Sequence, residues 1–223
     1  MKTHKLLILL LCIFTLSSCA TTKYICEEEF DAIENVAIVT PFTDIETIES
    51  RDSVVYDVDA TEDFSRFIVE GLMASALPTS KYLQMDLEEG RNSNAVLSIK
   101  DINPKYADEA QVPRELLNFL KEHDQRYGVF VFANGFLTNN KHYAKELVTG
   151  VLLAVVCTVI SLGTVTMYDI PEKNSYNMWL AVVDSEKERI VYLNTLSNNG
   201  GNATNFKHVS SSVNKLVKDF KKK

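Results

Sequence analysis

The stretch that decides the fold is YGVFVFANGFL, at residues 127–137. It is rich in β-branched and aromatic residues, which favour strands. A strand with one face in water alternates apolar and polar residues, whereas this run is apolar almost without a break. We therefore predict a strand that is buried on both faces, within a sheet that helices cover.

Four further strands are predicted around this one. NVAIVTPF at residues 35–42 and NAVLSIKDI at residues 94–102 precede it. The other two, at residues 176–183 and 190–196, flank the polar turn Ser185-Glu186-Lys187-Glu188 and have the spacing of a hairpin. The expected architecture is a single sheet of about five strands.

Three helices are predicted from apolar residues at helical spacing. The first is expected to open with Asp59 and Glu62 as a capping pair and to end before Pro78. Pro113 suits the first turn of the second helix, and the third closes the chain. The inward faces are Phe64, Phe67, Ile68, Gly71, Leu72 and Ser75 in the first helix, Leu116, Leu117 and Leu120 in the second, and Phe206, Val209, Val213, Leu216, Val217 and Phe220 in the third.

The order of these elements is β-α-β-α-β, an apolar segment, and then β-β-α. This order predicts an α/β fold, with α+β as the alternative. The polar, acidic residues 43–60 are expected to form a loop. Residues 35–223 are long enough for a single domain with a sizeable core.

The N-terminus has the layout of a secretory signal. Lys2 and Lys5 are followed by the apolar residues 6–16, and then by small residues and a cysteine. Leu16-Ser17-Ser18-Cys19 resembles the lipobox of bacterial lipoproteins. The resemblance implies cleavage after residue 18, a diacylglyceryl thioether on Cys19 and acylation of the new amino terminus. The alternative is an ordinary signal peptide that contains a cysteine.

Residues 19–34 are expected to be a mobile tether between this lipid anchor and the domain. Ala20 follows the cysteine, so the aspartate that retains lipoproteins at the inner membrane of enteric bacteria is absent, which favours the outer membrane. The acidic run Glu27-Glu28-Glu29 is interpreted as part of a solvated tether.

The charge balance makes nucleic acid an unsuitable partner. The chain has a formal net charge of −7, and the signal removes lysines but no acids. No basic stripe is present to neutralise phosphates. The only basic cluster, Lys221–Lys223, is expected to be solvated.

Of the four cysteines, Cys26 and Cys157 remain after Cys12 leaves with the signal and Cys19 is acylated. An exported protein could join the two in a disulfide. Two separate thiols are the preferred interpretation, because Cys26 lies in the expected tether and Cys157 in an apolar run. No metal-ligand spacing is present, and no cofactor is expected.

Residues 147–168 form an uncharged segment long enough to cross a bilayer. A spanning helix would place the basic residues before it on the wrong side, and many of its residues are polar or β-branched. Three interpretations stay open: a buried helix, a surface that contacts lipid or another subunit, and a membrane span. The contact surface would comprise Val151, Leu152, Val155, Val156, Val159 and Ile160.

The sequence contains only weak matches to the motifs of catalytic sites. Ser212 and Lys215 match the SxxK pattern of some serine hydrolases, but no accompanying motif is present. His123, His142 and His208 lack the spacing of a zinc site. Trp179, Tyr176 and Tyr192 could line a pocket, although cross-strand packing is the expected role of such residues in a hairpin.

Three stretches together resemble a family of envelope lipoproteins related to the curli-export lipoprotein and to the N-terminal domain of TolB. NVAIVTPF resembles the first strand, residues 64–77 resemble the helix after it, and YNMWLAVVDSEKERIVYLNTL resembles the later hairpin. Asp184 of the hairpin motif is kept, whereas its turn residues differ. The resemblance implies an α/β sandwich in the periplasm at the outer membrane, with a ring-like oligomer. The pore-forming hairpins of curli-type members are not implied, because the apolar segment lacks their alternating pattern.

These observations favour a non-enzymatic, membrane-anchored lipoprotein that serves as a scaffold or accessory in envelope assembly or export. Its partners would be the bilayer, through Cys19, and either an envelope protein or further copies of the chain. Two alternatives remain: a module that binds an envelope ligand in an aromatic-lined cleft, and a hydrolase. A hydrolase would need a nucleophile and a histidine within hydrogen-bonding reach.

Overall fold

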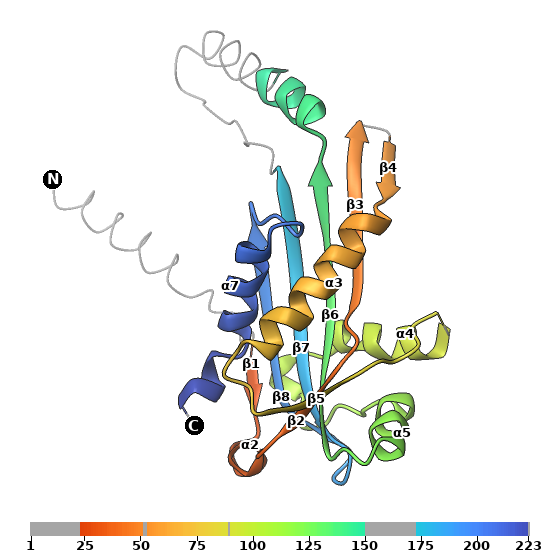
Figure 1. Cartoon of the computed structure of the whole chain (residues 1–223), viewed down its shortest axis with the longest axis vertical. Helices are drawn as coiled ribbons and strands as arrows, with labels where there is room; N and C mark the ends of the chain where they lie inside the picture. The colour runs from red at the N-terminus through yellow and green to blue at the C-terminus, as the bar shows by residue number, and fades with distance from the viewer. Residues whose placement is uncertain (1–22, 51–52, 89, 150–172, 223) are drawn as a thin grey trace, which may run out of the picture.

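β6 (Tyr127–Thr138) and β7 (Asn174–Asp184) form the centre of one eight-stranded sheet (Figure 1). The computed structural model describes residues 23–50, 53–88, 90–149 and 173–222. β7 is antiparallel to β6 along its whole length and to β8 (Arg189–Asn199) on its other side. The predicted central strand and the hairpin after it are therefore confirmed.

Five shorter strands extend this centre. β2 (Val36–Val39) and β3 (Phe42–Ser50) lie one after the other along the same edge of β6, both parallel to it. β5 (Thr79–Leu83) pairs with β2, and β4 (Ser53–Tyr56) pairs with β3. β1 (Lys23–Ile25) closes the other side, next to β8. The α/β class is confirmed, but the prediction of about five strands is too low.

Both faces of the sheet are covered. On one face, α3 (Val58–Met73) and α7 (Phe206–Leu216) pack over residues such as Val129 and Val131 of β6. On the other, α4 (Gly90–Leu97) and α5 (Arg114–Glu122) pack over Phe130 and Phe132. Figure 1 shows α3 and α7 side by side across the sheet. Successive side chains of β6 are thus buried on opposite faces of the sheet, in two separate cores. The uninterrupted apolar run of this strand predicts burial on both faces.

The helices on the first face begin at side chains that cap them. Asp57, rather than the predicted Asp59, caps α3, and its Oδ1 accepts from the Ala60 N–H at 3.0 Å. Asn205 caps α7 by accepting from Lys207 and His208. The helices approach closely at Gly71, where a Cβ atom would lie 3.3 Å from Val213. The predicted packing faces are buried or half-buried, except that Phe206 is 40% exposed beside the ring of Phe67. Ser75 lies beyond the end of α3, and Val217 and Phe220 lie beyond the end of α7.

Two segments have a secondary structure that differs from the predicted one. Residues 43–60 are not a loop, because β3, β4 and the start of α3 occupy them. Their acidic side chains suggest a loop, but Ile45 is buried and Asp44 and Glu46 point to the other face. Residues 94–102 are not a strand: they belong to α4 and to the 3₁₀ helix η1 (Ser98–Asp101). Ala95, Val96 and Ile99 have a spacing that also fits a helix, and all three are buried.

The folded part also begins earlier than expected. β1 and α2 (Glu27–Ala32) lie within residues 19–34, where a mobile tether was expected, and Phe30 and Ile33 are buried. The chain ends on the 3₁₀ helix η3 (Lys218–Lys222), and a further short turn, η2 (Pro104–Tyr106), precedes α5. α5 begins after Pro113 and buries its three leucines, as predicted.

The apolar segment is described only at its beginning. A helix begins at residue 140 and is described as far as residue 149, and Val148 on it is 58% exposed. The predicted contact residues between Val151 and Ile160, and also Cys157, lie outside the described residues. Within the described ranges, no helix combines the length and the apolar character that crossing a membrane requires.

Candidate functional site: the polar clusters around the first strand

The chain enters the sheet almost directly after Cys19. β1 begins at Lys23 and runs antiparallel to β8, with Lys23 opposite Asn194 and Ile25 opposite Tyr192. The Cys26 N–H continues the ladder by donating to the Val191 carbonyl at 2.9 Å. The first described residues are therefore part of the domain.

A polar cluster fixes the C-terminal turn beside this strand. Tyr192 is fully buried, and its hydroxyl donates to the Leu216 carbonyl and lies 3.1 Å from Asp219 Oδ2. Asn194 Nδ2 donates to the same carbonyl at 2.7 Å. Lys23 Nζ completes the cluster with two 3.1 Å bonds to the Asp219 carboxylate. Burial, together with the charge of Asp219, raises the pKa of Tyr192, so this phenol stays neutral.

An aromatic group joins α2 to the same place. The ring of Phe30 lies 4.6 Å from that of Phe220 and 5.6 Å from that of Tyr192, measured between centroids. Tyr192 and Phe220 complete the group at 5.2 Å. Both ends of the described chain are thus packed against β8, as the adjacent positions of β1 and the C-terminus in Figure 1 show.

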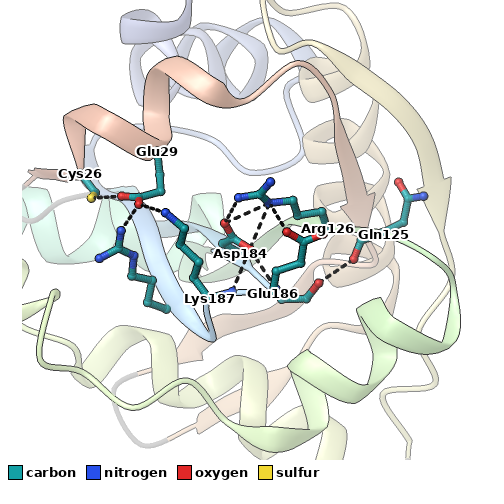
Figure 2. A network of polar contacts seen from close by, with 9 residues as sticks. Cys26, Glu29, Gln125, Arg126, Asp184, Glu186 and Lys187 are labelled. Carbon is teal, nitrogen blue, oxygen red and sulfur yellow. Dashed lines mark hydrogen bonds and ion pairs between the residues drawn. The ribbon is translucent and has the colours of Figure 1, made fainter.

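Glu29 ties α2 to the turn between β7 and β8 (Figure 2). Its carboxylate is only 2% exposed, and it accepts from the Cys26 thiol, from Lys187 and from Arg189. These bonds, the one from Cys26 first, lower the pKa of Glu29 to about 2 although burial opposes the shift. Glu29 is therefore ionised under all ordinary conditions, and it is a structural acid rather than a proton donor.

The turn itself is held by Asp184. Its side chain is fully buried, and Oδ1 accepts from the backbone N–H groups of Glu186 at 2.9 Å and Lys187 at 3.2 Å. Its Oδ2 accepts from Arg126 Nη2 at 3.0 Å. Figure 2 shows the Asp184 and Glu29 networks next to each other, with Lys187 contributing to both. The two acids together connect α2, β6 and the hairpin.

The catalytic candidates from the sequence are not brought together. Ser212 is fully buried, and its Oγ lies 2.9 Å from the Tyr176 hydroxyl and 3.1 Å from Asn198 Nδ2. His208 accepts from the Asn202 N–H at the start of α7, and His123 bonds to Phe119 on α5. His142 pairs with Glu146 one helical turn away. Among the described residues, no three His, Cys, Asp or Glu side chains form a group suited to a metal ion.

The three aromatic candidates do not share a cleft. Tyr176 and Tyr192 are buried in the core beneath α3 and α7. Trp179 lies on the opposite face of the sheet, 5.2 Å from Phe132 between ring centroids.

A groove of about 890 Å³ lies elsewhere, between the end of β2 and the start of β3. It is lined by Thr40, Pro41, Phe42, Thr43, Tyr56, Glu62, Gln84, Met85, Asp86, Leu87 and Glu88.

Sequence reasoning missed the role of Glu29 and of Asp219. Glu29 stood in an acidic run that was interpreted as solvated. The sequence does contain a sign that this segment is a packed helix: Phe30 and Ile33 are three residues apart, which is the spacing of one buried helical face. Asp219 stood within a lysine-rich tail and carried no signal. Cys26 is not part of a disulfide, and its thiol donates a hydrogen bond to Glu29.

Comparison with known proteins shows only remote likeness. No family model matches the chain, and no curated protein matches it. Among solved structures it is distantly similar to the PelC dodecamer from Paraburkholderia phytofirmans, with a TM-score of 0.38 and 11% identity over 84% of this chain and 86% of that one. The lipoprotein GNA1162 from Neisseria meningitidis has a TM-score of 0.34 and 12% identity, over 85% and 97% of the two chains.

The C-terminal domain of LpoB from Salmonella enterica is more remote still, with a TM-score of 0.28 and 8% identity over 74% and 83% of the two chains. Likeness at this level says nothing about what a protein binds or assembles with.

Proposed function

We propose that this protein is an exported lipoprotein whose domain is held at a membrane surface by an acylated Cys19. The proposal places it in the cell envelope, at the outer membrane and facing the periplasm, as a non-enzymatic scaffold or accessory in assembly or export. The observation that carries it is the short distance along the chain between the lipobox cysteine and the first strand.

Only three residues separate Cys19 from Lys23. An extended chain advances at most about 3.6 Å per residue, so the two Cα atoms lie within about 14 Å of each other. Lys23 is in turn paired to β8 and to Asp219. A lipid chain on Cys19 would therefore hold the domain against the bilayer.

Mass spectrometry of the mature protein tests the anchor. We expect an N-terminal residue 19 that carries a diacylglyceryl group and an amide-linked acyl chain, and we expect the Cys19→Ser protein to lose the lipid. Cys26→Ser is the matched control, because this cysteine lies within the fold and its loss should leave processing unchanged. An unmodified N-terminus in the wild-type protein would refute the anchor.

Crosslinking in intact cells, followed by identification of the attached chains, tests the scaffold role. We expect an envelope protein or further copies of this chain. The non-enzymatic part of the proposal is supported by Ser212, whose hydroxyl is buried and bonded to Tyr176 and Asn198. A protein that crosslinks to nothing and purifies as a monomer would count against a scaffold.

Ligand capture is a second candidate function, and the groove of about 890 Å³ favours it. Tyr56 on β4 is 53% exposed and lines the groove, whereas Tyr106 on η2 is 52% exposed and does not line it. If soluble fragments of envelope glycans bind there, their NMR signals should broaden with the wild type and with Tyr106→Ala, but not with Tyr56→Ala. Equal broadening with both variants would argue against the groove as the site.

A further inference from the structure

The expectation that the chain has no basic stripe is wrong at the C-terminus, where the last elements carry a stripe of lysines. Lys215, Lys218 and Lys221 follow one another at intervals of three residues, and all three are exposed. Leu216, Val217 and Phe220 between them are buried against the core. The lysines therefore point away from the protein, although the chain as a whole is acidic. We call these three residues the lysine stripe.

Folding places the lysine stripe beside the anchor. Asp219 lies between Lys218 and Phe220 and holds Lys23 through two 3.1 Å bonds. The stripe is therefore fixed next to the first residue of β1, which is itself within about 14 Å of Cys19 along the chain. The buried bonds of Tyr192 and Asn194 to the Leu216 carbonyl keep the turn in this position.

Two acidic residues of this region are paired, and the exposed ones lie on α2 and just after it, beyond β1. Asp219 is neutralised by Lys23, and Glu29 by Lys187 and Arg189. Glu27, Glu28 and Asp31 are exposed on α2, which follows β1 and packs through Phe30 against Phe220 of η3. β1 is three residues long and leads away from the anchor, so it separates these acids from the entry of the chain by roughly 10 Å. Figure 1 shows α2 at the end of β1 that is remote from this entry.

We propose that the lysine stripe contacts anionic lipid headgroups of the same membrane that holds the acylated Cys19. This inference rests on the proposed function and adds to it an orientation: the edge formed by β1, the end of α7 and η3 faces the bilayer. Near an anionic surface each lysine raises the affinity of a protein for the membrane by roughly fivefold at low salt. Three lysines together are therefore expected to raise this affinity by about a hundredfold. Salt weakens such contacts over a Debye length.

The unlipidated mature chain, from residue 20 onward, tests the contact without the anchor. It keeps every residue of the described fold, including β1 and η3. We expect it to sediment with vesicles of phosphatidylcholine and phosphatidylglycerol at low salt, and not with phosphatidylcholine alone. The variant K215Q/K218Q/K221Q should lose about a hundredfold in affinity.

A second triple variant controls for net charge. Lys81, Lys100 and Lys141 are exposed on β5, on η1 and on the helix that begins at residue 140, none of which borders β1. K81Q/K100Q/K141Q removes the same charge and should bind like the wild type. Equal losses in the two variants would overturn the proposal, because net charge alone would then explain the binding. Equal binding to both kinds of vesicle would also overturn it.

The lipidated protein in vesicles provides a second readout. Acetylation of lysines, followed by mass spectrometry, should show the lysine stripe protected in vesicles with phosphatidylglycerol and reactive in phosphatidylcholine alone. Lys81 and Lys100 should react equally in both. A lipidated protein whose stripe stays reactive would refute this inference and leave the anchor intact, whereas a missing lipid would refute the anchor and leave the vesicle result standing.

Discussion

At the scale of single residues, Glu29 makes the stability of the fold depend on pH. Its pKa is lowered from 4.5 to about 2 by the bonds it accepts. A carboxyl group with a lowered pKa in the folded state stabilises the protein above its unfolded pKa, and this contribution is lost as the pH falls through the folded value. We therefore expect Glu29→Gln to lower the urea midpoint at pH 7, and to lower it much less near pH 2.

Glu28 is the matched control, because it precedes Glu29 in the same helix and is exposed. Glu28→Gln should leave the urea midpoint unchanged across the same pH range. The measurement is a set of urea unfolding curves between pH 2 and pH 7, followed by tryptophan fluorescence of Trp179. If Glu29→Gln and wild type differ by the same amount at every pH, the assigned cause is wrong.

At the scale of elements, the hairpin turn depends on Asp184. Removal of its carboxylate in Asp184→Ala leaves two backbone N–H groups without their acceptor and takes the buried carboxylate away from Arg126. We expect a loss of about 2 kcal/mol in the free energy of unfolding. Glu186→Ala removes a second carboxylate that contacts Arg126, but this one is 65% exposed, so its loss should cost under about 0.5 kcal/mol. Similar losses from both substitutions in urea unfolding would exclude a special role for Asp184.

The close contact between β6 and β7 depends on Gly135. A Cβ atom there would lie 2.4 Å from the Ser175 carbonyl oxygen and 2.6 Å from Tyr176 Cβ. Gly135→Ala must therefore shift the backbone, and we expect a cost of about 1–3 kcal/mol. Gly90 at the start of α4 has open space around it, so Gly90→Ala is the control and should leave the thermal midpoint unchanged or slightly raised. A Gly135→Ala protein as stable as wild type would contradict the packing.

The long elements were predictable from the sequence and the short ones were not. β6, the β7–β8 hairpin and α7 have apolar patterns long enough to identify them. β1, β4 and β5 are three to five residues long, and they are strands because partners far along the chain pair with them. The apolar residues of α4 fit a strand or a helix equally well, and packing beneath the sheet selects the helix.

At the scale of the whole molecule, the proposed membrane contact combines Cys19, which is a prediction from the sequence, with an arrangement that only folding creates. Cys19 was predicted from the residues that precede it. The sequence predicts a solvated cluster at Lys221–Lys223, because nothing local connects these residues to the N-terminus. The bond from Lys23 to Asp219 spans 196 positions, and the bond from Lys187 to Glu29 spans 158. Such pairs follow from the path of β1 beside β8, which a three-residue strand does not reveal in advance.

If Cys19 is acylated as proposed, the length of chain between it and β1 becomes a functional quantity. Ten glycine and serine residues inserted between Thr21 and Thr22 would leave the described fold untouched, so the thermal midpoint should not change. The longer tether lowers the effective concentration of the domain at the membrane severalfold. We therefore expect weaker protection of Lys218 from acetylation in vesicles that contain phosphatidylglycerol. Replacement of residues 20–22 by Ser-Gly-Ser keeps the original length and should keep the protection. If the insertion leaves Lys218 as protected as before, the short tether does not hold the lysine stripe on the membrane.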